Sequence, residues 1–238
     1  MSILPYPNPL SRFTRRVAAL FLPASCLLCG ADSDAEPVCT ACVADLPPLP
    51  HPGCPLCADR TTHGERCGAC LKDPPAFSGV FAAYRYDYPL DRLIHALKYG
   101  HQLAVADWCA GRLAPLAGQA HFDRILPLPL HATRLRERGF NQSGEIARAL
   151  GRRLNRPVDV TSLLRTRATP PQAGRPHKER LHNVRGAFEC CTDLTGQHLL
   201  LVDDVLTTGA TANEAARVLK LHGAASVTVA VVARALKD

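Results

Sequence analysis

The residues best suited to chemistry form one short run late in the chain, from Asp203 to Thr211. The apolar stretch from Leu199 to Val202 leads directly into Asp203 and Asp204, and a Thr-Thr-Gly-Ala-Thr turn follows before a predicted helix. Adjacent carboxylates at the end of a buried strand are costly unless cations or hydroxyl donors meet them. They therefore suit a cleft that holds Mg²⁺ or a sugar diol.

The turn that follows the acids favours a bound phosphate. It comprises Thr207, Thr208, Gly209, Ala210 and Thr211. Its hydroxyl and backbone N–H groups would stand at a helix N-terminus, where donors and helix dipole both attract an anion. Any one of these residues is explained equally well as an ordinary helix cap. A cap needs only one acid or hydroxyl, however, whereas two acids, three threonines and a glycine converge here.

Other phosphate-binding signatures are absent from the sequence. No Gly-x-x-x-x-Gly-Lys-Ser/Thr occurs, which excludes a P-loop nucleotidase, and no Gly-x-Gly-x-x-Gly occurs either. The formal charge of +7 would attract a polyanion without specifying which one. Aromatic residues make up 5% of the chain, so stacking platforms for single-stranded nucleic acid are few, and a small anionic ligand is favoured.

A second set of chemically capable residues lies near the beginning of the chain. Eight of the 11 cysteines form four Cys-x-x-Cys pairs: Cys26 and Cys29, Cys39 and Cys42, Cys54 and Cys57, and Cys67 and Cys70. Each cysteine of the last two pairs lies 28 residues after its counterpart in the first two. This spacing is typical of structural zinc sites. Disulfides are the alternative, but they need an oxidising compartment.

The spacing leaves the arrangement of zinc open. Two ions held by sequential pairs, a cross-braced arrangement and a single ion all remain consistent with it. A catalytic zinc is disfavoured, because four thiolates leave no open position for water or substrate. The surrounding stretch is rich in proline and poor in large aliphatic residues, so it needs a metal to hold it together.

The chain length fits one full domain and a small module, since 238 residues exceed one average domain. Pro74 and Pro75 mark the boundary, so we expect a zinc module with an N-terminal helix at 1–76 and the main domain at 77–238. In the stretch from Arg12 to Cys26, Pro23 stops the apolar run after six residues, which is too short for a secretory segment. We therefore expect an amphipathic helix there, no membrane span and a cytoplasmic protein.

Apolar runs and helical periods alternate after residue 79, a pattern that predicts an α/β fold. We expect strands at 79–86, 124–128, 160–165, 198–205 and 226–234, and helices at 90–97, 103–116, 140–154 and 212–221. The last two strands are continuously apolar, as strands of a parallel sheet covered on both faces are. Ligands of such sheets bind at the carboxyl ends of the strands, which places the acidic pair at the binding edge.

The run from Val202 to Thr211 resembles the phosphoribosyl pyrophosphate motif of type I phosphoribosyltransferases. Together with the cysteine module, the chain is similar to the ComF family of competence-associated proteins. The segments 93–99, 126–131, 134–142 and 180–183 agree with this resemblance. It implies a type I phosphoribosyltransferase-like parallel sheet flanked by helices, after a small Cys-rich zinc module, with structural Zn²⁺ and with Mg²⁺ bound alongside the substrate.

The resemblance also implies roles for residues. Asp203 and Asp204 would be the catalytic residues and would hold the ribose hydroxyls, and the turn from Thr207 to Thr211 would cradle the 5′-phosphate. A pyrophosphate loop would fall at 128–138 and a lid at about 165–185. Lys98, Arg134 and Arg138 are candidate partners of the remaining phosphate groups. A solvated basic face or a nucleic-acid patch explains the arginines as well.

Two functions stay open on the sequence. One is a phosphoribosyltransferase that uses phosphoribosyl pyrophosphate or a related sugar phosphate, although no acceptor pocket is identifiable. The other is a non-catalytic module that responds to this ligand and acts on single-stranded DNA or a DNA-uptake helicase, as the competence resemblance suggests. A degraded scaffold is disfavoured by the intact motif.

Overall fold

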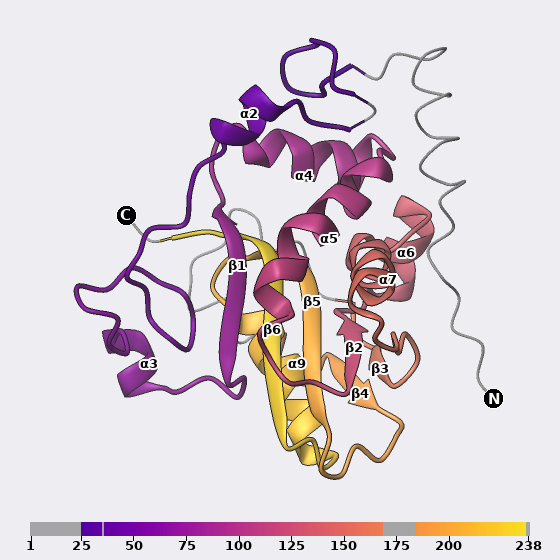
Figure 1. Ribbon diagram of the computed structural model, residues 1–238. Coiled ribbons are helices and arrows are strands. Elements are labelled where there is room, and N and C mark those ends of the chain that lie inside the picture. Colours follow the sequence, from indigo (N-terminus) through magenta and orange to yellow (C-terminus); the bar gives the residue numbers. More distant parts are fainter. Residues whose placement is uncertain (1–24, 35, 169–183, 237–238) are drawn as a thin grey trace, which may run out of the picture. The chain divides into compact units, whose positions relative to one another are not determined.

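The computed structural model describes residues 25–34, 36–168 and 184–236 (Figure 1). The chain divides into two compact units, residues 1–46 and residues 47–238. The expected N-terminal helix and residues 169–183 of the expected lid lie outside the described residues. Across the described residues, no helix has both the length and the apolar character that crossing a bilayer would take.

The two halves of the cysteine repeat fold in the same way, one in each unit. Helix α2 (Thr40–Ala44) begins directly after Cys39, and α3 (Gly68–Lys72) begins directly after Cys67. The backbone at both cysteines is extended, with ψ of 159° and 158° respectively. The 28-residue period of the sequence is therefore also a period of the structure.

The larger unit is built on a four-stranded parallel sheet. Its strand order is β1 (Gly79–Arg85), β6 (Ser226–Arg234), β5 (His198–Leu206) and β2 (Arg124–Pro127). The two central strands, β5 and β6, carry the continuous apolar runs, and Leu199 to Val202 are at most 1% exposed. A single parallel bridge from Val158 to Ile125 extends the edge beyond β2.

Helices cover both faces of this sheet (Figure 1). On one face α5 (Ala104–Ala117) packs against β1, and α7 (Gln142–Leu154) packs against β2 and β5. On the other face α9 (Ala210–Leu221) packs on β5 and β6, where Leu199 and Leu201 share a core with Ala215. The amphipathic helix α4 (Leu90–Tyr99) buries its four predicted apolar positions, Leu90, Leu93, Ile94 and Leu97. The predicted α/β class is confirmed.

The expected strand at 160–165 is shorter and belongs elsewhere. Strand β3 (Leu163–Arg165) pairs antiparallel with β4 (Phe188–Cys190), outside the main sheet. The cause is Asp159, whose Oδ1 accepts the N–H groups of Thr161 and Ser162, both at 3.0 Å. This side chain folds the preceding residues into a turn, so they cannot extend the strand.

The segment expected as a pyrophosphate loop is largely helical. Residues Ala132–Arg138 form α6, whose first turn is capped by His131 Nδ1 accepting the N–H of Thr133 at 3.3 Å. Gly139 ends the helix with a left-handed φ of 79°. Within the segment expected as this loop, residues 128–131 precede the helix and have no regular secondary structure. The dense charges of this segment hide its helical period.

Candidate functional site

A cavity of about 510 Å³ lies where the carboxyl ends of β5 and β2 meet α4, α6 and α7. It contains most of the residues that the sequence singled out, contributed by elements far apart in the chain. Of the candidates, Lys98, Arg134, Arg138, Asp203, Asp204, Thr207 and Thr211 line the cavity. Thr208, Gly209 and Ala210 lie in the adjoining turn and do not line it.

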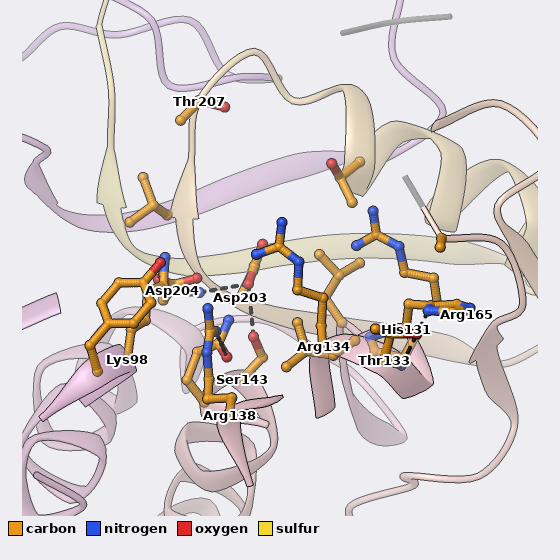
Figure 2. A pocket seen from close by; sticks show the side chains of 18 of the residues that line it. Lys98, His131, Thr133, Arg134, Arg138, Ser143, Arg165, Asp203, Asp204 and Thr207 are labelled. Atoms are coloured by element: carbon orange, nitrogen blue, oxygen red, sulfur yellow. Dashed lines mark hydrogen bonds and ion pairs between the residues drawn. The ribbon is translucent and has the colours of Figure 1, made fainter. Parts of the chain in front are cut away.

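The acidic pair lies at the floor of the cavity, and the two carboxylates differ in their partners (Figure 2). Asp204 is 3% exposed and forms an ion pair with Lys98 Nζ. Asp203 is partly exposed, and its Oδ1 accepts the hydroxyl of Ser143 at 2.8 Å and the N–H of Asp204 at 2.9 Å. Asp203 is therefore the carboxylate that has the freer access to a ligand.

These contacts separate the acidities of the two carboxyl groups. Burial and the neighbouring charge of Asp204 raise the pKa of Asp203 to about 7, which the Ser143 hydrogen bond only partly offsets. Burial would also raise the pKa of Asp204, but the charge of Lys98 outweighs it and lowers that pKa below 3.8. One carboxylate is held ionised, and the other titrates near neutrality. Paired groups with pKa values pushed apart are typical of functional sites.

Basic side chains face the acids across the cavity. Figure 2 shows Arg134 and Arg138 close to the acidic pair, with Arg165 further along the lining of the same cavity. Arg138 is held by Gln142 Oε1 at 2.5 Å, and its guanidinium lies 5.2 Å from the ring centre of Tyr99. Four cationic side chains against two carboxylates leave the described lining at a net charge of +2 when both carboxylates are ionised. The cavity thus suits an anion that also presents groups able to bind a carboxylate.

The turn between β5 and α9 is fixed through its carbonyl oxygens. Arg234 donates to the carbonyls of Leu206 and Thr207, at 3.2 and 2.5 Å, and the Gly209 carbonyl accepts the N–H of Asn213 at 2.8 Å. Within the turn, the N–H of Ala210 is bonded to Thr208 Oγ1 at 3.3 Å. Gly209 takes a left-handed φ of 79°, as the N-cap of α9.

Sequence reasoning missed two polar residues of the cavity, Gln142 and Ser143, which are 4% and 1% exposed. Both stand in the first turn of α7, capped by Asn141 through the N–H of Ser143 at 3.1 Å. Asn141 was recognisable as a cap, but only the packing of α7 against β5 brings Ser143 to Asp203. The aromatic residues Tyr86 and Tyr99 were also missed as lining.

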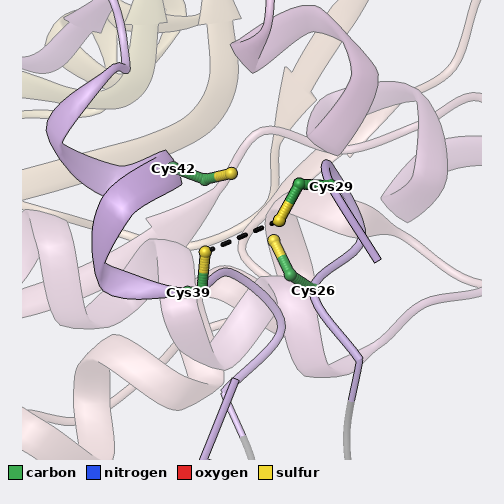
Figure 3. A group of neighbouring side chains, drawn as sticks. All are labelled: Cys26, Cys29, Cys39 and Cys42. Carbon is green, nitrogen blue, oxygen red and sulfur yellow. Dashed lines mark hydrogen bonds between the residues drawn. The ribbon is translucent and has the colours of Figure 1, made fainter. Parts of the chain in front are cut away.

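The eight cysteines gather into two groups of four, and the ligand atoms within each group lie within 4.8 Å of one another. Figure 3 shows the first group, formed by Cys26, Cys29, Cys39 and Cys42, and the second is formed by Cys54, Cys57, Cys67 and Cys70. Of the three arrangements that spacing left open, the structure has sequential pairs.

The geometry of both groups fits a zinc ion. A tetrahedron with Zn–S bonds of about 2.3 Å has sulfur–sulfur edges of about 3.8 Å. The Cys29–Cys39 and Cys57–Cys67 sulfur separations are 3.7 and 3.6 Å. Burial would raise the pKa of Cys26, but backbone N–H groups lower it to about 6, whereas the hydrogen bond with Cys29 raises the pKa of Cys42 in the same group. A bound zinc ion would favour the thiolate form of all four cysteines.

Comparison with known proteins agrees with both parts of the chain. Residues 17–71 match the family model of the double zinc ribbon domain, and residues 137–238 match that of the phosphoribosyl transferase domain. The DNA utilization protein YhgH of Escherichia coli K12 is 36% identical over 192 residues, which are 77% of this chain and 84% of that protein. Competence protein F of Haemophilus influenzae is 30% identical over 209 residues, covering 83% of this chain and 90% of that protein. Competence protein ComFC of Bacillus subtilis is 27% identical over 208 residues, covering 81% and 82%.

The chain belongs to the ComF family. Its zinc ribbon match contains all eight paired cysteines, which together with their geometry supports structural zinc in both groups. The phosphoribosyl transferase match contains Arg138, the acidic pair and the turn. Lys98 and Arg134 precede the matched stretch, and the structure alone brings them to the same cavity.

Proposed function

We propose that this ComF-family chain binds Mg²⁺-bound phosphoribosyl pyrophosphate, or a closely related sugar phosphate, in the cavity beside β5. In this proposal Asp203 and Asp204 hold the ribose hydroxyls. The 5′-phosphate is cradled by the turn that comprises Thr207, Thr208, Gly209, Ala210 and Thr211. Arg134 and Arg138 hold the pyrophosphate, and Lys98 serves the substrate through its pair with Asp204.

One observation carries the proposal: two adjacent carboxylates of unequal acidity share a cationic cavity at the carboxyl edge of a parallel sheet. A purely structural acid pair would need both charges compensated, and within residues 25–34, 36–168 and 184–236 the ion pair of this acidic pair is the one between Asp204 and Lys98. Asp203 keeps a pKa of about 7. A sugar diol or a Mg²⁺-bound ligand would supply the missing compensation.

The cationic residues of the cavity can balance the negative charge of the ligand. A helix N-terminus contributes only about 0.3–1 kcal/mol per anion, which is too little for a ligand with three phosphate groups. Planar guanidinium groups can donate two parallel hydrogen bonds to each phosphate. Arg138 is already oriented by Gln142 and Tyr99, so it loses less side-chain entropy on binding.

Catalysis in this site would be electrostatic. Mg²⁺, when bound with the pyrophosphate, would neutralise part of the leaving-group charge. Arg134 and Arg138 would stabilise the departing pyrophosphate while an acceptor nitrogen attacks C1 of the ribose, with no covalent nucleophile from the protein. Whether the chain transfers the phosphoribosyl group or senses its donor is distinguished by pyrophosphate release over a broad acceptor panel.

Calorimetric titration with phosphoribosyl pyrophosphate, with and without Mg²⁺, tests the proposal. We expect Mg²⁺-dependent binding to the wild type and its loss in the Asp203→Asn/Asp204→Asn double variant. Glu137→Gln is the matched control, because this exposed carboxylate on α6 lies outside the cavity. Equal affinity in the double variant and the wild type would refute the proposed site.

A second candidate function follows from the relatives, which are named as DNA utilization and competence proteins. The chain would then be a non-catalytic module that responds to the same ligand and acts on single-stranded DNA or on a helicase of DNA uptake. It predicts binding to single-stranded DNA that weakens with salt and with neutralisation of Arg134 and Arg138. Absent or salt-insensitive binding would exclude direct DNA contact.

Two further assignments belong to the same proposal. Residues 1–76 form the zinc module and residues 77–238 the phosphoribosyltransferase-like domain. The protein works in the cytoplasm, where thiols stay reduced and available to zinc.

A further inference from the structure

The geometry points to Arg234 as a positioning residue that couples the second cysteine group to the ligand turn. The second cysteine group is Cys54, Cys57, Cys67 and Cys70, and the ligand turn is the stretch from Thr207 to Thr211. Zinc at the former and a phosphate ligand at the latter are inferred to stabilise each other. This inference rests on the proposed function for the identity of the ligand.

Arg234 ends β6 and is 5% exposed, and its guanidinium joins two segments that are remote in sequence. Its Nε donates to the carbonyl of Cys57 at 2.8 Å. Its Nη1 donates to the carbonyls of Leu206 and Thr207, at 3.2 and 2.5 Å, and to that of Ala235. A buried guanidinium that donates to backbone carbonyls of two segments holds both segments in place, here those around Cys57 and Thr207.

Electrostatics keep Arg234 in this position. Its charge is met by the carboxylate of Asp59, with Nη2 and Oδ2 3.9 Å apart, and Asp59 also closes the turn after Cys57. The N–H of Cys54 donates to the Asp59 carbonyl at 2.7 Å. The same residue therefore contributes to the cysteine turn through its backbone and to the Arg234 contact through its side chain.

A second connection reaches the ligand turn from the other end of the cysteine group. After α3 the chain runs to Ala76, whose N–H donates to Asn213 Oδ1 on α9 at 2.6 Å. The next residue, Phe77, is 3% exposed, and a Cβ placed on Gly209 would lie 3.8 Å from its ring. The ligand turn thus lies beside Arg234, which is bonded to Cys57, and beside Phe77, which follows Cys70 closely in the chain.

These contacts predict a reciprocal coupling. If loss of zinc frees the segments around Cys57 and Cys70, Arg234 loses its hydrogen bond to the Cys57 carbonyl and holds the ligand turn less firmly. The chain that leads from Cys70 to Phe77 loses one of its anchors at the same time. By linkage, a ligand that orders the turn must then favour zinc by the same factor. Coupling between sites is typically five- to 150-fold, so we expect an effect of roughly tenfold.

The test measures zinc release from the full chain carrying Cys26→Ser and Cys29→Ser, so that the retained zinc reports on the second group. A chromophoric chelator follows release with and without Mg²⁺-phosphoribosyl pyrophosphate, and calorimetry gives the affinity for that compound. Arg234→Gln removes the contacts, Arg234→Lys keeps the charge without the fork, and Arg60→Gln changes an exposed arginine of the same cysteine turn.

We expect the ligand to raise the zinc affinity of the second group roughly tenfold, and thereby to slow zinc release, in the parent chain and in Arg60→Gln. In Arg234→Gln this slowing should largely disappear, zinc should leave faster without ligand, and ligand affinity should fall about tenfold, with Arg234→Lys intermediate. A folded Arg234→Gln chain with parental zinc release and affinity would overturn the inference. A role in stability alone would lower the melting temperature without removing the effect of ligand on zinc release.

A second variant and a measurement without ligand complete the test. If Arg234→Gln does not fold, Asn213→Ala breaks the second connection and should reduce the effect of ligand on zinc release, and an unchanged effect would contradict the coupling. If the parent chain does not bind phosphoribosyl pyrophosphate, the proposed function fails. Faster zinc release from Arg234→Gln without ligand then still tests the Arg234 contact, and an unchanged rate refutes it.

Discussion

Replacing Asp203 with asparagine should stabilise the ligand-free chain at alkaline pH. The pKa of Asp203 is raised from 3.8 to about 7, so between about pH 4 and pH 7 the folded state holds a proton that the unfolded state has lost. Stability therefore falls as the pH rises through that window. In the wild type the Ser143 hydroxyl and the Asp204 N–H donate to Asp203 Oδ1. Asparagine keeps an oxygen that can accept both hydrogen bonds, and it carries no titratable proton.

The size of this effect follows from the shift in pKa. A change from 3.8 to about 7 corresponds to about 4 kcal/mol at pH 8. Solvent reaches the partly exposed carboxylate and screens the repulsion from Asp204. We therefore expect Asp203→Asn to raise the free energy of unfolding by about 2 kcal/mol at pH 8 and by less than about 1 kcal/mol at pH 5.

Urea unfolding of the zinc-loaded wild type and variant at pH 5 and pH 8 measures this difference. Glu137→Gln serves as the control and should change the free energy of unfolding by less than about 0.5 kcal/mol at both values. The same Asp203→Asn chain should bind Mg²⁺-phosphoribosyl pyrophosphate more weakly, as expected of a functional residue that costs stability. If Asp203→Asn is equally or less stable at pH 8, Asp203 does not carry the electrostatic strain described above.

Three other perturbations give distinct outcomes. Lys98→Met leaves Asp204 as a buried unpaired carboxylate and should lower the free energy of unfolding in urea by about 3–5 kcal/mol. The double variant Lys98→Met/Asp204→Asn should recover most of this loss. If the losses of the two single variants add instead, the ion pair does not stabilise the chain. Arg138→Ala should weaken phosphoribosyl pyrophosphate binding at least tenfold, or about 1.4 kcal/mol, in calorimetry. Arg136→Ala, on the exposed side of α6, should leave the affinity unchanged. Similar losses in both variants would indicate a general charge effect. Metal analysis should find two zinc ions per wild-type chain and one in Cys54→Ser, whereas a single ion in the wild type would rule out two filled groups.

Local patterns were sufficient for much of the fold. The apolar run from Leu199 to Val202 predicted a strand buried on both faces, and the positions Leu90, Leu93, Ile94 and Leu97 predicted a helix with one buried stripe. Both predictions depend on the spacing of apolar residues, which can be read directly from the sequence. The 28-residue cysteine period likewise predicted a repeated metal-binding unit, and the structure supplied the grouping into sequential pairs.

The errors arose where a tertiary or side-chain contact decides the backbone. Asp159 folds the residues before β3 into a turn, and His131 caps a helix in a segment that reads as a charged loop. The cavity shows the same limit. Asp203 and its turn were identifiable from adjacent residue types, whereas Ser143 and the Lys98–Asp204 pair depend on how α7 and α4 pack beside β5.

A crystal structure of the chain with Mg²⁺ and phosphoribosyl pyrophosphate would show whether the cavity beside β5 holds a Mg²⁺-bound sugar phosphate. We expect ribose density against Asp203, the 5′-phosphate at the turn from Thr207 to Thr211, and the pyrophosphate near Arg134 and Arg138. Ligand density elsewhere on the chain, with this cavity filled only by water at saturating ligand, would contradict it.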